Sequence, residues 1–230
     1  MKTLSTILTV AICLCATACT QSNDNVDNAV IDYTPNAFYY QRNSLFELLP
    51  TGPDDIIFIG NSLTNGCEWS ELLSNPNVKN RGISADVLAG VIDRIDTIAA
   101  GHPAKIFIQC GINDVSHNLS PDSIGKSMEQ LIVRIKEISP TTRIYLQSLL
   151  PVNTDFHVYT RLAEKEGVIL ECNRIYKEIA ERQHVTWIDL FSELSNEKGQ
   201  LMPEITNDGL HLLGQGYVIW RNTVAPYVAE

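Results

Sequence analysis

The sequence predicts a three-layer α/β/α domain built around a parallel sheet. Short runs rich in β-branched residues are bounded by glycine or polar turns, and each is followed by a longer segment of helical period. The short runs are almost continuously apolar, which is typical of strands covered by helices on both faces. The 230 residues, 44% hydrophobic and 19% charged, suffice for one domain with a sizeable core and exclude a disordered chain, collagen or a coiled coil.

The pattern places each element in order. Strands are expected at residues 55–60, 78–81, 105–109, 143–147 and 185–189, and helices at residues 67–74, 86–100, 121–139, 164–182 and after Gly214. In the 164–182 segment one helical face collects the apolar residues Val168, Cys172, Ile175 and Ile179. The pattern indicates no internal repeat and no second domain.

The first residues predict an export signal. Lys2 and the amino terminus make a positive start, and the apolar stretch 7–15 is too short to cross a bilayer, which takes about 20 residues. The small residues that follow end in Cys19 and resemble a bacterial lipobox, in which this cysteine carries the lipid. Residues 1–18 are therefore expected to be a lipoprotein signal peptide, with plain secretion as the alternative.

The export signal defines the expected layout of the chain. Residues 19–34 are polar and acidic, as a flexible tether between a lipid and a domain would be, and residues 35–230 form the predicted domain. The expected location is the cell envelope, on the periplasmic face or the cell surface, with the membrane contacted through the lipid anchor.

Charge and cysteine content narrow the classes of partner. The 17 Lys and Arg against 27 Asp and Glu give a net charge of −10, which disfavours nucleic acid as a partner. Three cysteines remain in the predicted domain, Cys67, Cys110 and Cys172, and are expected to be buried apolar residues with at most one disulfide. The chain has no Cys-x-x-Cys and no His-Glu-x-x-His motif, so neither a metal nor another cofactor is expected.

Reactive residues follow the predicted strands at their carboxyl ends, where ligands bind in sheets of this kind. Ser62 follows the first strand, Asn113 follows the third, and Asp208 and His211 precede the last helix. A serine hydroxyl becomes a nucleophile when an imidazole takes its proton and a carboxylate orients the imidazole. Each residue alone has an ordinary structural explanation, such as a helix cap or a turn. Their joint order favours a serine hydrolase.

The reaction also needs hydrogen-bond donors for the developing oxyanion, each of which contributes about 3–4 kcal/mol. The candidates are the N–H groups of Ser62 and Gly82 and the side-chain amide of Asn113. A glycine at position 82 would let the backbone approach the reacting oxygen.

Asp189, which ends the last predicted strand, is the rival to Asp208 as the triad acid. The remaining histidines, His102, His157 and His184, are expected in turns or on the surface.

Four segments of the chain resemble the sequence blocks of the SGNH (GDSL-like) esterases: Gly60-Asn61-Ser62-Leu63, Asn80-Arg81-Gly82, Gly111-Ile112-Asn113-Asp114 and Asp208-Gly209-Leu210-His211. The resemblance runs from about residue 54 to the C-terminus. It implies a flavodoxin-like sheet of order 2-1-3-4-5 and ester hydrolysis through an acyl-serine intermediate. It further implies that Ser62 is the nucleophile, His211 the base and Asp208 its orienting acid, and that Ser62, Gly82 and Asn113 form the oxyanion hole.

One residue departs from the family pattern. Asn61 stands where the family has aspartate before the nucleophile. The amide keeps one acceptor oxygen but loses the charge. Because the family's triad acid is the one before the histidine, activity is expected to survive.

The chain looks most like the platelet-activating-factor acetylhydrolase-like and carbohydrate O-acetylesterase-like members, judging by residues 60–64 and 149–153. An exported member would meet glycans, so the expected reaction is removal of acetyl groups from a sugar ester. Trp69, His117 and Asn153 are candidate substrate contacts. The alternatives are a packing role for Trp69 and solvated loop positions for the other two.

Three other functions compete with this interpretation. The first is hydrolysis of longer acyl chains, as by a lysophospholipase or thioesterase. The second is a noncatalytic glycan-binding module, which no sequence feature supports because every catalytic position is filled. The third is a flavodoxin-type electron carrier, which would not need the Asp208-x-x-His211 pair. The other common serine hydrolase architecture is disfavoured because Thr64 occupies the second glycine position of Gly-x-Ser-x-Gly.

Overall fold

The computed structural model describes residues 35–230. The predicted signal peptide (1–18), the lipid-bearing Cys19 and the acidic tether (19–34) lie outside the described residues and stay predictions. From residue 35 onward, no helix combines the length and the apolar character that crossing a membrane requires.

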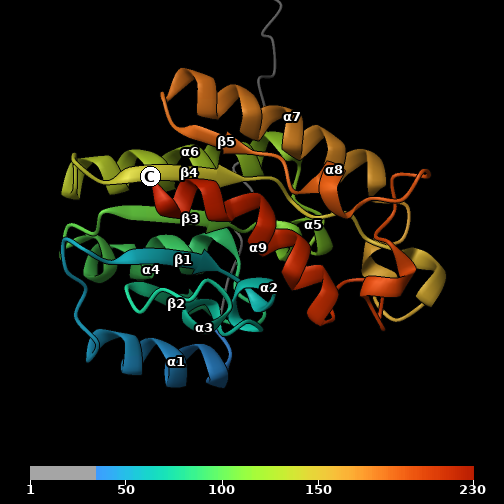
Figure 1. Cartoon of the computed structure of the whole chain (residues 1–230). Coiled ribbons are helices and arrows are strands. Elements are labelled where there is room, and N and C mark those ends of the chain that lie inside the picture. The colour runs from blue at the N-terminus through green and yellow to red at the C-terminus, as the bar shows by residue number, and fades with distance from the viewer. Residues whose placement is uncertain (1–34) are drawn as a thin grey trace, which may run out of the picture.

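The centre of the structure is a five-stranded parallel sheet of order 2-1-3-4-5, as expected (Figure 1). Its strands are β1 (Ile56–Gly60), β2 (Val78–Gly82), β3 (Lys105–Gln109), β4 (Arg143–Gln147) and β5 (Thr186–Ile188). β1 and β3 are buried at every position, which explains their continuous apolar character. β5 is shorter than predicted, because Asp189 leaves the sheet to accept the Ser192 N–H at 3.0 Å.

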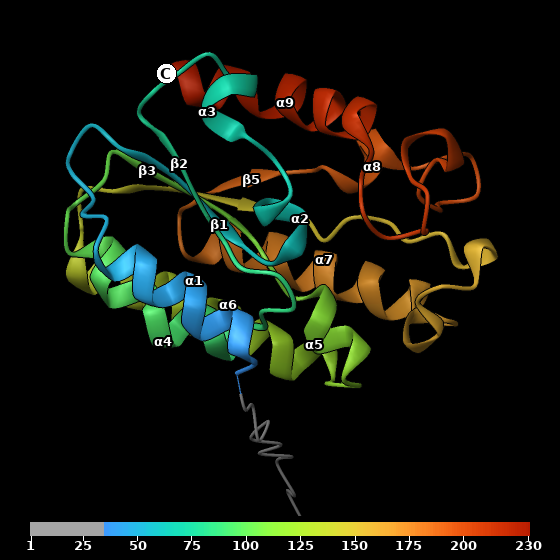
Figure 2. The ribbon, with the colours of Figure 1, turned by 90° about the horizontal axis from the view of Figure 1, so that it is seen from below.

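Helices cover both faces of the sheet, so the predicted three-layer architecture is confirmed (Figure 2). One face carries α1 (Ala37–Glu47), α4 (Leu88–Ala99), α5 (Ile112–Ser116), α6 (Pro121–Ile138) and α7 (Glu166–Arg182). The other carries α3 (Trp69–Leu72), α8 (Phe191–Leu194) and α9 (Gly214–Ala229), while α2 (Ser62–Asn65) follows β1 directly. Three short 3₁₀ turns, η1 (Thr154–Phe156), η2 (Thr160–Leu162) and η3 (Pro203–Ile205), lie in the connections.

The sequence pattern predicts α3, α4, α6, α7 and α9, and it misses the other helices. Helix α6 starts where the Ser120 side chain accepts the Ser123 N–H and Pro121 takes the first helical position. The sequence pattern does not predict α1, α2, α5 or α8. The last three are single turns, and α1 buries only Tyr39 and Phe46, so no apolar stripe marks it.

A stack of aromatic rings fills the core on the α9 face of the sheet. Phe58, Phe107 and Tyr145 occupy equivalent positions on three adjacent strands, with ring centroids 4.6 and 4.4 Å apart. Trp69 extends the stack from Phe58 at 4.5 Å and meets Trp220 of α9 edge-on at 5.0 Å. These contacts hold α3 and α9 against the sheet. The three domain cysteines are buried and unpaired, as expected.

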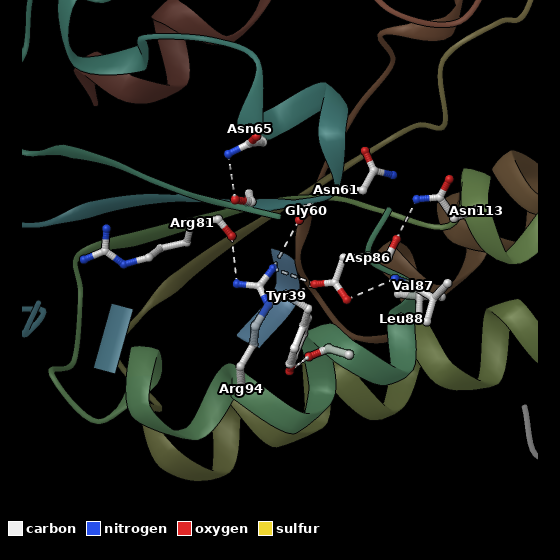
Figure 3. A network of polar contacts seen from close by, with 12 residues as sticks. Tyr39, Gly60, Asn61, Asn65, Arg81, Asp86, Val87, Leu88, Arg94 and Asn113 are labelled. Atoms are coloured by element: carbon white, nitrogen blue, oxygen red, sulfur yellow. Dashed lines mark hydrogen bonds and ion pairs between the residues drawn. The ribbon is translucent and has the colours of Figure 1, made fainter. Parts of the chain in front are cut away.

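A buried ion pair joins the carboxyl ends of β1 and β2 (Figure 3). Arg94 of α4 and Asp86 have fully buried side chains, and the Arg94 Nε donates to Asp86 Oδ2 at 3.0 Å. The same guanidinium donates to the Arg81 carbonyl at 2.8 Å and to the Gly60 carbonyl at 3.1 Å. One side chain thus binds three segments that end next to Ser62.

Replacing one partner of this pair should strongly destabilise the fold. Arg94→Met removes the cation from the buried Asp86 carboxylate and the donor from two carbonyls, so the free energy of unfolding should fall by about 3–5 kcal/mol. Urea denaturation measures this loss. Arg174→Met is the matched control: it removes an exposed arginine that pairs with Glu171 and Glu178, and should change stability little. Equal effects of the two substitutions would contradict the role assigned to Arg94.

Candidate active site

Ser62 lies at the carboxyl end of β1, as the first residue of α2. The Asn61 side chain caps this helix, because its Oδ1 accepts the Leu63 N–H at 3.0 Å. Aspartate could accept the same bond, so the departure at position 61 preserves the cap. The Asn61 Nδ2 is buried and finds no hydrogen-bond partner among the described residues. Ser62 itself is half-buried and turns its hydroxyl toward His211, with Oγ 2.9 Å from Nε2.

His211 is oriented from its other side by Asp208. Its Nδ1 lies 2.8 Å from Asp208 Oδ2, while Asp208 Oδ1 accepts the N–H groups of Leu210 and His211 at 2.9 and 2.8 Å. Burial acts to raise the pKa of Asp208, but the hydrogen bonds from His211 and the two amides outweigh it and lower the pKa below its ordinary value. An ionised Asp208 holds the proton on Nδ1 and leaves Nε2 free to accept from Ser62.

Asp189 does not compete for this position. Its two carboxylate oxygens accept the N–H and the hydroxyl of Ser192, at 3.0 and 2.7 Å, and so cap the start of α8. The residues that the sequence places far apart, Ser62 and the Asp208–His211 pair, are brought together by the fold. His102, His157 and His184 lie exposed in turns, with φ between 48° and 56°, as expected.

The prediction that the Gly82 N–H is an oxyanion donor is wrong. This N–H donates to Asn80 Oδ1 at 2.8 Å, within β2. The reason for glycine is also different from the expected one. A Cβ at position 82 would lie 2.3 Å from the Asn65 nitrogen, so the missing side chain allows α2 to pack against β2.

Ala85, in the turn after β2, is a residue of the site that sequence reasoning missed. Ala85 lines the same cavity as Ser62 and has a φ of 64°, a left-handed conformation that is rare for alanine. Among the described residues its N–H has no hydrogen-bond partner. Because alanine carries no signal for this conformation, only the position of the turn after β2 could have indicated it.

Asn113 reaches the cavity as expected. It lies in α5, after β3, and its Nδ2 donates one hydrogen to the Asp86 carbonyl at 2.7 Å (Figure 3). The second hydrogen of the same amide is left for another acceptor. Asn113 therefore depends on the turn that the Arg94 ion pair holds.

An open cavity of about 570 Å³ lies in front of Ser62. The hydroxyl-bearing residues Ser62, Ser84, Ser116, Tyr159 and Thr160 line it, together with Asn113, His211 and the exposed Arg161. Val158, Leu162 and Leu210 add apolar side chains. The Ser84 and Ser116 hydroxyls already donate to Asn65 Oδ1 at 3.1 Å and to the Asn113 carbonyl at 2.8 Å. The lining therefore combines a substantial apolar surface with several polar side chains.

Tyr159 is a second residue that the sequence does not predict. Its hydroxyl lies 3.1 Å from His211 Nδ1, and its ring meets the imidazole edge-on with centroids 5.4 Å apart. Burial raises its pKa, and a hydrogen bond to Asp208 acts in the same direction. The residue belongs to an irregular segment between β4 and α7, where no periodic pattern marks the positions that face inward.

None of the three candidate substrate contacts lines this cavity. Trp69 is 1% exposed and donates to the Thr64 carbonyl at 2.8 Å, so it is a packing residue. His117 is exposed at the end of α5, outside the lining. Asn153 is buried, donates to the Leu201 carbonyl at 2.9 Å and binds the Gly209 carbonyl through its own N–H at 2.8 Å. Its contacts support the loop that carries Asp208.

A serine, an imidazole and a carboxylate in hydrogen-bonded sequence, at the carboxyl edge of a parallel sheet, form the arrangement of a serine hydrolase. The model of the GDSL-like lipase/acylhydrolase family matches residues 58–219. The chain belongs to this family and is a carboxylic ester hydrolase.

Solved structures share the fold. A Streptococcus pneumoniae protein whose description names platelet-activating factor is 26% identical, with a TM-score of 0.75 over 83% of this chain and 92% of that one. A GDSL-like lipase of Bacteroides thetaiotaomicron is 21% identical, with a TM-score of 0.73 over 84% and 98%. An acetylxylan esterase of Geobacillus stearothermophilus is 18% identical, with a TM-score of 0.63 over 78% and 96%. No curated protein matches the chain in sequence.

Asp114, next to Asn113, is a buried carboxyl group that the reaction does not use. It is 1% exposed and accepts the Leu88 N–H on both oxygens, each at 3.2 Å. Burial raises the pKa of Asp114 to about 7, and the charge of Asp86 acts in the same direction. The native state therefore holds this proton at a pH where an unfolded aspartate, with a pKa of about 3.9, has lost it.

This difference predicts a pH-dependent stability. Because the pKa of Asp114 is higher in the native state, its favourable contribution is full below about pH 4 and is lost as pH rises to about 7. The unfolding free energy of the wild type should fall relative to that of Asp114→Asn across this interval, at up to about 1.4 kcal/mol per pH unit. Urea denaturation of both proteins at several pH values measures the difference. A difference that stays constant from pH 4 to 7 would exclude a raised pKa.

Proposed function

We propose that the protein removes acetyl groups from carbohydrate hydroxyls through an acyl-serine intermediate. The observation that carries the proposal is the continuous hydrogen-bonded relay from Ser62 to His211 and Asp208, with distances of 2.9 and 2.8 Å. Its geometry matches the requirement that nucleophile and base lie within hydrogen-bond reach and that a third group orients the base.

The relay supports two successive transfers of the acyl group, first from the sugar to Ser62 and then from Ser62 to water. His211 Nε2 takes the proton of Ser62 as Oγ attacks the carbonyl carbon of the ester, and the charge of Asp208 stabilises the imidazolium. The imidazolium then donates this proton to the leaving sugar oxygen. In the second half, His211 takes a proton from water, the hydroxide attacks the acyl-serine, and acetate leaves as Ser62 regains its proton.

Three donors are available for the oxyanion: the N–H groups of Ser62 and Ala85 and the free hydrogen of the Asn113 amide. Neither N–H has a hydrogen-bond partner within residues 35–230, and the Asn113 amide is held by the Asp86 carbonyl at 2.7 Å. A donor fixed in advance at the position of the developing charge contributes about 3–4 kcal/mol to transition-state stability.

The substrate class follows from the cavity wall. Four other hydroxyl-bearing residues and Asn113 line the cavity beside Ser62, and such polar side chains suit the hydroxyls of a sugar. The structurally similar acetylxylan esterase supports the choice of an acetyl ester. The export signal predicted over residues 1–18 would carry the domain to a compartment where glycans are exposed.

Removal of the nucleophile tests the mechanism. Hydrolysis of p-nitrophenyl acetate by residues 20–230 should fall by about 10³-fold or more in kcat on Ser62→Ala, because the oxyanion donors alone sustain little turnover. Ser70→Ala is the matched control, since Ser70 is exposed on α3 away from the cavity, and should retain wild-type kcat. Equal and negligible rates for the wild type and Ser62→Ala would favour either the noncatalytic glycan-binding module or a cavity that rejects this ester, and a glycan-binding assay would separate the two.

The length of the substrate's acyl chain tests whether acetyl is the preferred acyl group. Across p-nitrophenyl esters of 2 to about 12 carbons, kcat/KM should be highest for the shortest chains, because a long acyl group in this cavity would remove water from its polar side chains without replacing their hydrogen bonds. Steady-state kinetics of the series gives the profile. Rates that rise past about eight carbons would replace the acetyl assignment with a long-chain acyl hydrolase.

A further inference from the structure

The cavity in front of Ser62 differs in charge from the rest of the protein. The chain carries 27 Asp and Glu against 17 Lys and Arg. Of the described residues that line the cavity, none is acidic, and Arg161 is the one with a permanent positive charge. In so acidic a chain, a cavity wall that bears a cation and no carboxylate is suited to an anionic ligand.

Arg161 has no carboxylate partner in the described chain. Of the eight other arginines, five pair with Asp or Glu: Arg94, Arg134, Arg143, Arg174 and Arg182. The remaining three, Arg42, Arg81 and Arg221, do not line the cavity. Arg161, by contrast, makes neither an ion pair nor a side-chain hydrogen bond with any residue that the structure describes, and it is exposed. Its five N–H donors are therefore available to a ligand.

The backbone around Arg161 holds it at the cavity. Arg161 is the middle residue of η2, and the turn is closed by the Leu162 N–H on the Tyr159 carbonyl at 2.9 Å. The side chain of Leu162 is 2% exposed and anchors the turn in the core, while Tyr159, two residues before Arg161, contacts His211. The guanidinium therefore belongs to a turn that is fixed at both ends beside the reacting groups.

We propose that Arg161 pairs with a negatively charged group on the alcohol part of the ester, so that the substrate is an acetylated acid sugar. This inference rests on the proposed acetylesterase function. The acetyl group is uncharged and is consumed at Ser62, so the partner of Arg161 belongs to the sugar. The planar fork of arginine binds a carboxylate through two parallel hydrogen bonds, and it binds phosphate in the same way.

Three substrates that differ only at carbon 6 of the ring test the proposal. They are mono-O-acetylated methyl glucoside, the corresponding glucuronoside, which carries a carboxylate, and the 6-phosphate. Acetate release gives kcat and KM for each. The wild type should prefer at least one anionic sugar over the neutral one by about tenfold in kcat/KM, mainly through KM, because Arg161 would contact a part of the substrate remote from the reacting bond. The better of the two anions identifies carboxylate or phosphate as the ligand group.

Variants assign the preference to one side chain. Arg161→Gln should reduce the ratio of anionic to neutral kcat/KM to about 1, and Arg161→Lys should restore part of it, because lysine keeps the charge without the fork. Lys165→Gln is the matched control: it removes a positive charge four residues away that does not line the cavity, and should keep the wild-type ratio. The ratio should also shrink when the salt concentration is raised to about 0.5 M.

The outcomes separate this inference from the function on which it rests. Hydrolysis of all three sugars at equal kcat/KM, dependent on Ser62, would overturn the role of Arg161 and leave the acetylesterase intact. A preference that survives Arg161→Gln would also overturn it. If no acetylated sugar is hydrolysed while p-nitrophenyl acetate is, carbohydrate esters are not the substrates, and both proposals fail.

Discussion

The ion pair of Arg94 with Asp86 is the contact on which the geometry of the reaction site depends. A buried guanidinium needs several acceptors to offset its lost hydration, and here it has one carboxylate and the carbonyls of Gly60 and Arg81. Those carbonyls end β1 and β2, directly before the segments that present Ser62 and Ala85. The Asp86 carbonyl in turn holds the Asn113 amide. Arg94 therefore holds the strand ends that precede Ser62 and Ala85 and, through Asp86, the turn that binds Asn113. Figure 3 shows the contacts among Arg94, Asp86 and Asn113.

The rest of the site is assembled by loops that the sheet supports. The turn with Asp208 binds its own backbone through Oδ1 and is held by Asn153 from the loop after β4. The same loop continues to Tyr159, against His211, and to Arg161 at the cavity. This division is the usual one in α/β proteins, in which rigid strands position loops that carry the chemistry.

Two of the four site residues that sequence reasoning misplaced share a physical cause. Gly82 and Trp69 were each expected to act at the site because of their residue type, and each serves packing. Glycine is required where α2 approaches β2, and the tryptophan continues the ring stack from Phe58 to α9. A residue type reports what a side chain can do, but neighbours that are distant in sequence decide which of its uses is realised. Ala85 shows the opposite. Its residue type gives no sign of a role at the site, and its uncommon positive φ goes with its place in the lining of the cavity.

Periodicity along the chain was sufficient for the layered architecture, and the resemblance of four segments to the SGNH esterases supplied the strand order and the roles of the relay. Near-continuous apolar strands alternating with amphipathic helices imply a covered parallel sheet, and carboxyl ends that meet at one edge bring Ser62 close to Asp208 and His211. Tertiary structure decided the rest of the site. It set the direction of individual N–H groups and the φ of Ala85, and it placed Tyr159 and Arg161 at the cavity. The reason is that these features lie in turns, where no repeating pattern exists and conformation is set by contacts between segments that are far apart in the chain.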